Sequence, residues 1–138
     1  MTHSDMIEFK TKGDGDIVDL TDKVRSAVEK SGISSGIVSV CGIGSTVAVT
    51  TIEYEPGLQK DVPALMEKLI PSNVTYQHDA TWGDGNGYAH LRSALVGTTF
   101  TTAVESKAPV LGTWQQIVFL DFDNRSRQRR VFVQVIGE

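Results

Sequence analysis

Two histidines, two aspartates and an asparagine are grouped between residues 76 and 90, with glycines around them. If a helix begins near Asn86, then Asn86 and His90 lie four residues apart on one helix face, and His78 reaches that face from the preceding loop. Neutral imidazoles beside a carboxylate such as Asp84 can hold a divalent metal or transfer protons. We therefore predict a catalytic group composed of His78, Asp84, Asn86 and His90.

The same segment also has an interpretation without chemistry. Asp84 or Asn86 would then cap the helix, the glycines would form a turn, and both histidines would make ordinary hydrogen bonds. In either case, a helix that starts at Asn86 presents backbone N–H groups that attract an anion. Both interpretations fit the spacing.

A second polar group follows the sequence Gly42-Ile43-Gly44. Glycines before hydroxyl side chains can surround a phosphate with backbone N–H groups, so Ser45 and Thr46 are predicted to bind a phosphorylated ligand. The segment is not a P-loop, because no lysine follows Gly44 in the required place. The alternative is a β-turn made flexible by its glycines.

Two carboxylates flank the chain break at Pro56-Gly57. Glu53 and Asp61 are predicted as ligands of a divalent metal, Mg²⁺ or Zn²⁺, together with His78 and His90. The alternative makes Glu53 a charge at a strand end and Asp61 a carboxylate near a helix N-terminus, where it interacts favourably with the helix dipole.

Four arginines lie within six residues near the end of the chain, at Arg125, Arg127, Arg129 and Arg130. Such a group can bind phosphate or RNA, but it is more typical of a solvated strand edge that resists aggregation.

Trp114, in the segment Leu111–Gln116, is interpreted as a core anchor. Cys41 lies in an apolar run and is predicted to be buried and unreactive.

The elements that must position these residues follow from hydrophobic periodicity. Strands are predicted over 7–11, 36–42, 46–53, 98–105, 115–121 and 129–136, the last two forming a hairpin. Helices are predicted between Thr21 and Gly32, over 59–70 and over 86–96, with 71–85 irregular. Because strands outnumber helices, we expect an α+β fold with a mainly antiparallel sheet or sandwich and about three helices.

Length and composition narrow the function classes. The 138 residues are expected to form a single domain over 1–138. A net charge of −4 gives no general reason to expect nucleic-acid binding. A single cysteine, no signal peptide and no membrane-spanning apolar run lead us to expect a cytoplasmic protein with no membrane partner.

The order and spacing of these pieces resemble the YjbQ-like family, which is also named for secondary thiamine-phosphate synthase. The resemblance extends over nearly the whole chain. It rests on Thr46–Glu53 with Asp61, Tyr76-Gln77-His78, Asp84-Gly85-Asn86, Ala89-His90-Leu91, Gly97, Leu111–Gln116 and Val133–Gly137. Many relatives carry a histidine nine residues before the glutamate, where this chain has Gly44, so a metal here would rest on His78, His90 and carboxylates.

The resemblance implies a compact α+β homotrimer whose site collects Glu53, Asp61, His78, Asp84, Asn86, His90 and Gln115, with Gln115 as a binding residue and a divalent metal suspected. It implies a weak transferase that joins a pyrimidine diphosphate to a thiazole phosphate and releases pyrophosphate. The alternatives are a metal-dependent enzyme acting on another phosphorylated small molecule, and a trimeric binding module without catalysis.

Overall fold

The computed structural model describes residues 1–138 and contains eight strands and four helices. The strands are β1 (Thr2–Thr11), β2 (Asp16–Asp19), β3 (Ser35–Ile43), β4 (Val47–Ile52), β5 (Thr99–Glu105), β6 (Ala108–Pro109), β7 (Gln116–Asp121) and β8 (Arg127–Gly137). The helices are α1 (Thr21–Ser31), α2 (Pro56–Leu69), α3 (Gln77–Trp82) and α4 (Gly87–Val96). None of these helices combines the length and apolar character needed to cross a bilayer.

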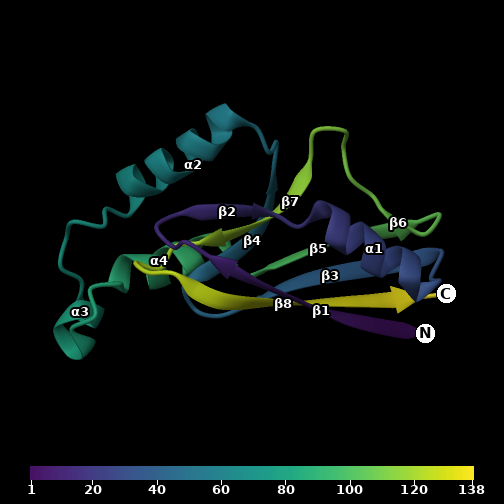
Figure 1. The fold of residues 1–138 in the computed structure, drawn as a ribbon, viewed down its shortest axis with the longest axis horizontal. Helices are drawn as coiled ribbons and strands as arrows, with labels where there is room; N and C mark the ends of the chain where they lie inside the picture. Colours follow the sequence, from purple (N-terminus) through teal and green to yellow (C-terminus); the bar gives the residue numbers. More distant parts are fainter.

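The strands form two sheets in which every pairing is antiparallel. The larger sheet has the order β1-β8-β3-β5-β6, and the smaller sheet has the order β2-β7-β4. In Figure 1, α3 and α4 lie at one end of the sheets, and α2 extends along the side of the smaller sheet. The predicted α+β class with mainly antiparallel sheets is confirmed.

The main core lies between the larger sheet, α1 and one face of the smaller sheet. Its α1 side is the predicted stripe of Leu20, Val24, Ala27 and Val28, all fully buried. Asp19 orients the start of α1 by accepting hydrogen bonds from the backbone N–H and the hydroxyl of Thr21. Thr21, predicted as the N-cap, is therefore the first helical residue, and Gly32 ends the helix in a left-handed conformation.

A second core covers the opposite face of the smaller sheet. Val118 and Leu120 of β7 pack there with Met66 of α2 and with Tyr88 and Ala89 of α4. The alternate residues of β7, including Phe119, point into the main core. Because β7 contributes to both cores, it fixes α4 relative to the larger sheet.

The predicted C-terminal hairpin is wrong. Strand β7 pairs with β2 and β4, whereas β8 lies between β1 and β3 in the other sheet, so residues 122–126 cross between sheets. Val131, Val133 and Val135 face the core, but Ile136 on the other face is exposed, so β8 is central and buried fully on one face only. The polar residues that suggested a turn instead hold the crossing through side-chain hydrogen bonds.

Three further predictions need correction. A fourth helix, α3, lies inside 71–85, which was predicted to be irregular. Helix α2 begins at Pro56 rather than at residue 59, because the Glu55 carboxylate accepts hydrogen bonds from the N–H groups of Gly57 and Leu58. Cys41, predicted to be buried, is half-buried.

Strands β3 and β8 approach closely where Gly36 faces Gly137. A Cβ atom at Gly36 would collide with the carbonyl oxygen of Ile136, and one at Gly137 would collide with that of Ser35. Neither position therefore tolerates a side chain without movement of the strand backbone.

We expect Gly36→Ala to lower the free energy of unfolding by about 1–3 kcal/mol, because the added methyl group overpacks a backbone contact. Urea denaturation measures this change. The matched control is Gly112→Ala, where a new Cβ would meet only the Gln115 side chain at 3.7 Å, an ordinary contact. Equal stability of both variants would contradict the close approach.

Candidate functional site

A hollow of about 380 Å³ opens at the end of the molecule where α3 and α4 meet the two sheets. Strand β7 ends there, and β4 and β8 begin there, because Val47 pairs with Asp121 and Thr11 pairs with Arg127. The hollow is lined by Gly44, Ser45, Thr46, His78, Trp82, Asp84, Asn86, His90, Asp123, Arg127 and Arg129. Six of the predicted site residues are therefore together: His78, Asp84, Asn86, His90, Ser45 and Thr46.

The floor of the hollow is built on an ion pair between Asp121 and Arg129. Nε and Nη2 of Arg129 donate to the two oxygens of Asp121 at 2.7 and 2.9 Å, and the Asp121 side chain is fully buried. Nη2 also donates to the Thr46 hydroxyl at 2.8 Å, while Thr11 donates to Asp121. This pair joins β7 of one sheet to β1 and β8 of the other.

Asp123 is the second acid of the floor. It accepts hydrogen bonds from the Asn124 backbone N–H at 2.8 Å, from Thr46 at 3.0 Å, from Arg127 at 2.9 Å and from Asn86 at 3.3 Å. Burial of Asp123 raises the pKa of its carboxyl, but these hydrogen bonds and the Arg127 charge outweigh burial, so that the pKa lies below its ordinary value. Asn86 is thus tied to the floor through Asp123.

A shared cap positions the two histidines. Asp79 accepts hydrogen bonds from the N–H groups of Tyr76 and Gly87, both at 2.9 Å, and so joins the start of α3 to the start of α4. These two backbone bonds, and then the nearby His78, lower the pKa of Asp79. The Gly87 N–H, expected to be free for an external anion, is therefore already bound.

Gly87 lets the two helices approach closely. A Cβ there would lie 2.9 Å from Cβ of Tyr76 and 3.3 Å from Cβ of His78. Because α4 packs this tightly on α3, the rings of His78 and His90 lie against each other, with centroids 4.3 Å apart and planes tilted by 40°. The pair forms one wall of the hollow.

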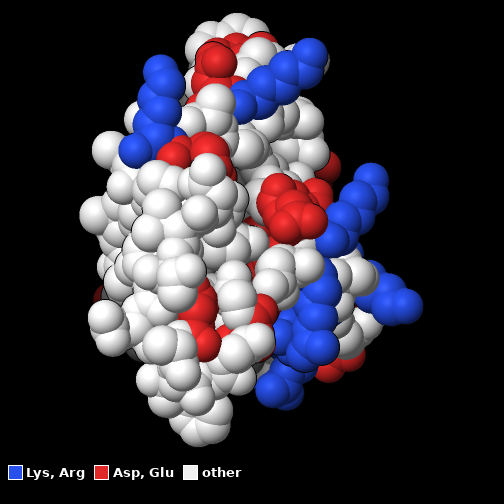
Figure 2. Space-filling view, turned by 90° about the vertical axis from the view of Figure 1, so that its left-hand side faces the viewer, with Lys and Arg blue, Asp and Glu red and all other residues white.

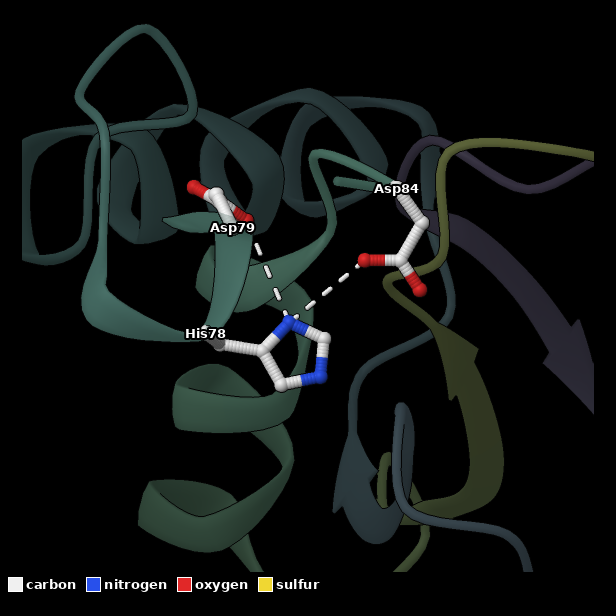
Figure 3. Close-up of side chains that lie close together, drawn as sticks. All are labelled: His78, Asp79 and Asp84. Atoms are coloured by element: carbon white, nitrogen blue, oxygen red, sulfur yellow. Dashed lines mark ion pairs between the residues drawn. The ribbon is translucent and has the colours of Figure 1, made fainter. Parts of the chain in front are cut away.

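His78 also faces two carboxylates, as Figure 3 shows. Its Nδ1 lies 3.5 Å from Oδ1 of Asp84 and 3.9 Å from Oδ1 of Asp79. This nitrogen is buried and has no hydrogen-bond partner, and the Asn86 side-chain oxygen is likewise unpaired. His78, Asp79 and Asp84 form a group that could hold a cation.

Part of the arginine charge remains available to a ligand. Arg129 uses Nε and Nη2 in the floor, and its Nη1 borders Gly44, where a Cβ would lie 3.3 Å away. Arg127 is bonded only through Nε. In Figure 2, Lys and Arg side chains lie along the right of this end of the molecule and on both sides near its top, interspersed with acidic ones, and a broad uncharged area covers the left. The basic groups at this end are therefore individual donors and not a continuous basic surface.

Three predicted site residues lie outside the hollow. Glu53 and Gln115 are at the opposite end of β4, where Gln115 donates to the Thr51 hydroxyl at 3.2 Å. A strand rises about 3.3 Å per residue, which separates Glu53 from Thr46 by about 23 Å. Asp61 is exposed on α2. Within one chain, Glu53 and Asp61 thus do not join the histidines around one metal.

Sequence reasoning missed Asp121 and Asp123 and interpreted Arg127 and Arg129 as a solvated edge. Arg129 is 8% exposed. The available signal was the alternation of Asp121 and Asp123 with buried apolar residues, followed by arginines at the same spacing of two. Buried acids require cations nearby, because an unpaired buried charge is very costly.

We expect Asp123→Asn to lower the free energy of unfolding at pH 7 by about 1–3 kcal/mol, because it weakens charge-assisted hydrogen bonds. The folded-state pKa of Asp123 is lowered, so the wild type gains this stability above about pH 4 and loses it as the pH falls through the folded-state pKa. The difference between the proteins should therefore shrink in acid.

Urea denaturation between pH 2.5 and 7 measures this difference. Glu105→Gln, at an exposed strand end, is the control that removes one carboxylate without disturbing the floor. A stability difference between wild type and Asp123→Asn that stays constant down to pH 2.5 would contradict the ionised state of Asp123.

Comparisons with known proteins agree with this fold. The model of a family described as "UPF0047 protein YjbQ-like" matches residues 5–138. A UPF0047 protein of Archaeoglobus fulgidus is 40% identical over 130 residues, which cover 94% of this chain and 98% of the relative. A UPF0047 protein of Methanothermobacter thermautotrophicus is 35% identical over 132 residues, covering 96% and 90% of the two chains.

Two solved structures are also similar. The crystal structure of a YbjQ-like protein of unknown function from Sulfolobus solfataricus has a TM-score of 0.90 at 28% identity, covering 100% of both chains. A protein of the YjbQ/UPF0047 family from Clostridium acetobutylicum has a TM-score of 0.83 at 33% identity, covering 94% of this chain and 99% of that one. The chain belongs to the YjbQ-like UPF0047 family.

Proposed function

We propose that this protein is an enzyme that acts on a phosphorylated small molecule in the hollow beside His90. The observation that supports it is the convergence of two imidazoles, the Asp84 carboxylate and two arginines around one cavity of about 380 Å³. Small-molecule sites of this size commonly combine a few directed polar groups in this way.

The arginines suit a phosphate group. Nη1 of Arg129 and both terminal nitrogens of Arg127 are charged donors that make no hydrogen bond within the protein. Because Asp121 and Asp123 hold both guanidinium groups in place, little reorganisation is needed when a phosphate binds. Ser45 is exposed at the same edge and offers a hydroxyl.

The residues present also fit a divalent cation. Metal–ligand distances of about 2.0–2.2 Å place neighbouring ligand atoms about 3–3.5 Å apart. The distances from Nδ1 of His78 to Asp84 and Asp79, 3.5 and 3.9 Å, are close to this spacing, and the unpaired Nδ1 has no competing proton donor or acceptor. His78 and Asp84 would hold the ion, with Asp79 keeping its capping bonds; the ion would neutralise negative charge on phosphate oxygens.

The specific reaction we propose is thiamine-phosphate synthesis. The bond between the pyrimidine's exocyclic methylene and the diphosphate oxygen breaks, the diphosphate keeps the electron pair, and the thiazole nitrogen forms the new C–N bond. Arg127 and Arg129 would stabilise the departing charge, and Asn86 and His90 would orient the partners. A reaction that passes through a dissociated pyrimidine cation requires little specific chemistry from the protein, and this agrees with a weak activity.

A second candidate is another metal-dependent reaction on a phosphorylated compound, and the cluster of His78, Asp79 and Asp84 favours it.

In either case we propose a homotrimer. Large apolar side chains exposed on α2 and on the uncovered face of the larger sheet, namely Leu65, Leu69, Ile37 and Ile136, support assembly.

An assay of purified protein with both substrates tests the reaction. We expect thiamine phosphate to form, and we expect His90→Ala and Asp84→Ala to lower turnover by about 100-fold, a common effect of losing one catalytic group. Glu105→Gln is the control, and circular dichroism checks folding. Unchanged turnover in both alanine variants would remove this site, and no product from the wild type would leave only the second candidate.

Metal binding is tested independently of activity. Calorimetric titration of untagged protein with Zn²⁺ or Mn²⁺ should give one site per chain, lost in His78→Ala and Asp84→Asn. Equal affinity in wild type and His78→Ala would contradict the assignment.

A further inference from the structure

Trp82 is an unexplained feature of the hollow. Its side chain is 74% exposed, and it belongs to neither hydrophobic core. It ends α3, a six-residue helix in which no residue is buried. The packing of the monomer therefore gives no reason for a large aromatic residue at this position.

Trp82 nevertheless has a defined place. The Asp79 cap fixes α3 against α4, and Gly83 ends α3 in a left-handed conformation with a φ of 74°. Beyond this turn comes Asp84, so Trp82 and Asp84 both border the hollow. Trp82 is the one large apolar side chain among the eleven residues that line it.

We propose that Trp82 is a binding residue that stacks on the planar ring of the substrate while the phosphate of the same molecule contacts Arg127 and Arg129. The proposal rests on the proposed function: it assigns one residue to the aromatic ring of the substrate, and it limits the second candidate reaction to phosphorylated aromatic compounds. An indole face can stack on any flat ring, and loss of such a contact weakens the binding of nucleic-acid bases by about 5- to 150-fold.

The residues that line the hollow favour a ligand whose ring contacts Trp82 and whose phosphate contacts the arginines. Every other lining residue is a glycine or has a polar or charged side chain, so Trp82 is the one hydrophobic side chain of the hollow. The charged donors come from β8, and Trp82 comes from α3 at the rim. A cavity of about 380 Å³ has room for one ring and its phosphate.

The chain has two tryptophans, Trp82 and Trp114, which allows a selective experiment. Trp114 is 70% exposed and does not line the hollow, so Trp114→Phe leaves Trp82 as the single indole reporter. Three probes are titrated into this variant with excitation at the long-wavelength edge of tryptophan absorption: phenyl phosphate, phenol and inorganic phosphate.

We expect phenyl phosphate to quench Trp82 saturably and to bind more tightly than phenol or phosphate. In calorimetric titrations, Trp82→Ala should weaken phenyl phosphate binding by at least about 5-fold and change inorganic phosphate binding less than 2-fold. Trp82→Phe should restore most of the affinity. Arg127→Ala should weaken both phosphate-containing probes.

Other outcomes separate the two proposals. If phosphate and phenyl phosphate bind equally and Trp82→Ala changes neither, the stacking role is wrong while the anion site stands. If Trp82→Ala alters only the molecular mass in light scattering, Trp82 is an assembly contact and the stacking role is wrong. If no phosphate-containing probe binds at millimolar concentration, both the anion site and the stacking role are overturned.

Discussion

The buried pair of Asp121 and Arg129 is the interaction on which the candidate site depends. The Asp121 carboxylate is fully buried, so its charge must be met by nearby donors, and Arg129, Thr11 and the Asp123 backbone N–H supply them. Loss of one partner from such a pair typically costs about 3–5 kcal/mol. Because Arg129 and Thr11 belong to the other sheet, the hydrogen bonds that they donate to Asp121 also fix the distance between the sheets.

The rest of the site is built outward from this pair. Thr46 bridges Arg129 to Asp123, and Asp123 in turn binds Arg127 and Asn86. Asn86 begins α4, which carries His90 one turn later. Both arginines, Thr46 and Asn86 are thus linked to the floor, and the Asp79 cap joins the helices that carry the histidines. Such preorganisation suits the proposed binding of a charged substrate.

Local patterns in the sequence predicted much of this arrangement. The apolar spacing of α1 and the positions of Asn86 and His90 on α4 follow from helix geometry, so they were accessible without a structure. Helix α3 was missed because it buries no residue and so lacks apolar periodicity. The β7–β8 hairpin was wrong because Asp123 and Asn124 have the residue types of a turn, while the pairing partners of both strands lie far away in sequence.

Charged residues were the least predictable part of the site. Whether Arg129 is solvated or buried depends on Asp121, which the fold brings beside it from another sheet. Likewise, Glu53, Asp61 and Gln115 have suitable chemistry, but β4 separates Glu53 from Thr46, and Asp61 follows on α2. Gln115 precedes β7 and lies beside Thr51, at the same distant end of β4. Residue type therefore indicated the kind of chemistry, and topology decided which residues take part.

Helix α2 is attached to the rest of the fold by few buried residues. It buries only Met66, and its C-terminal end is held by Arg92 of α4, which donates to the Ile70 carbonyl and to Glu67. Little burial means that local opening of α2 requires far less free energy than opening of β7, so the α2 amides should exchange with solvent deuterium much sooner. Since α4 carries both Arg92 and His90, a ligand that rigidifies the hollow should also slow exchange at the end of α2.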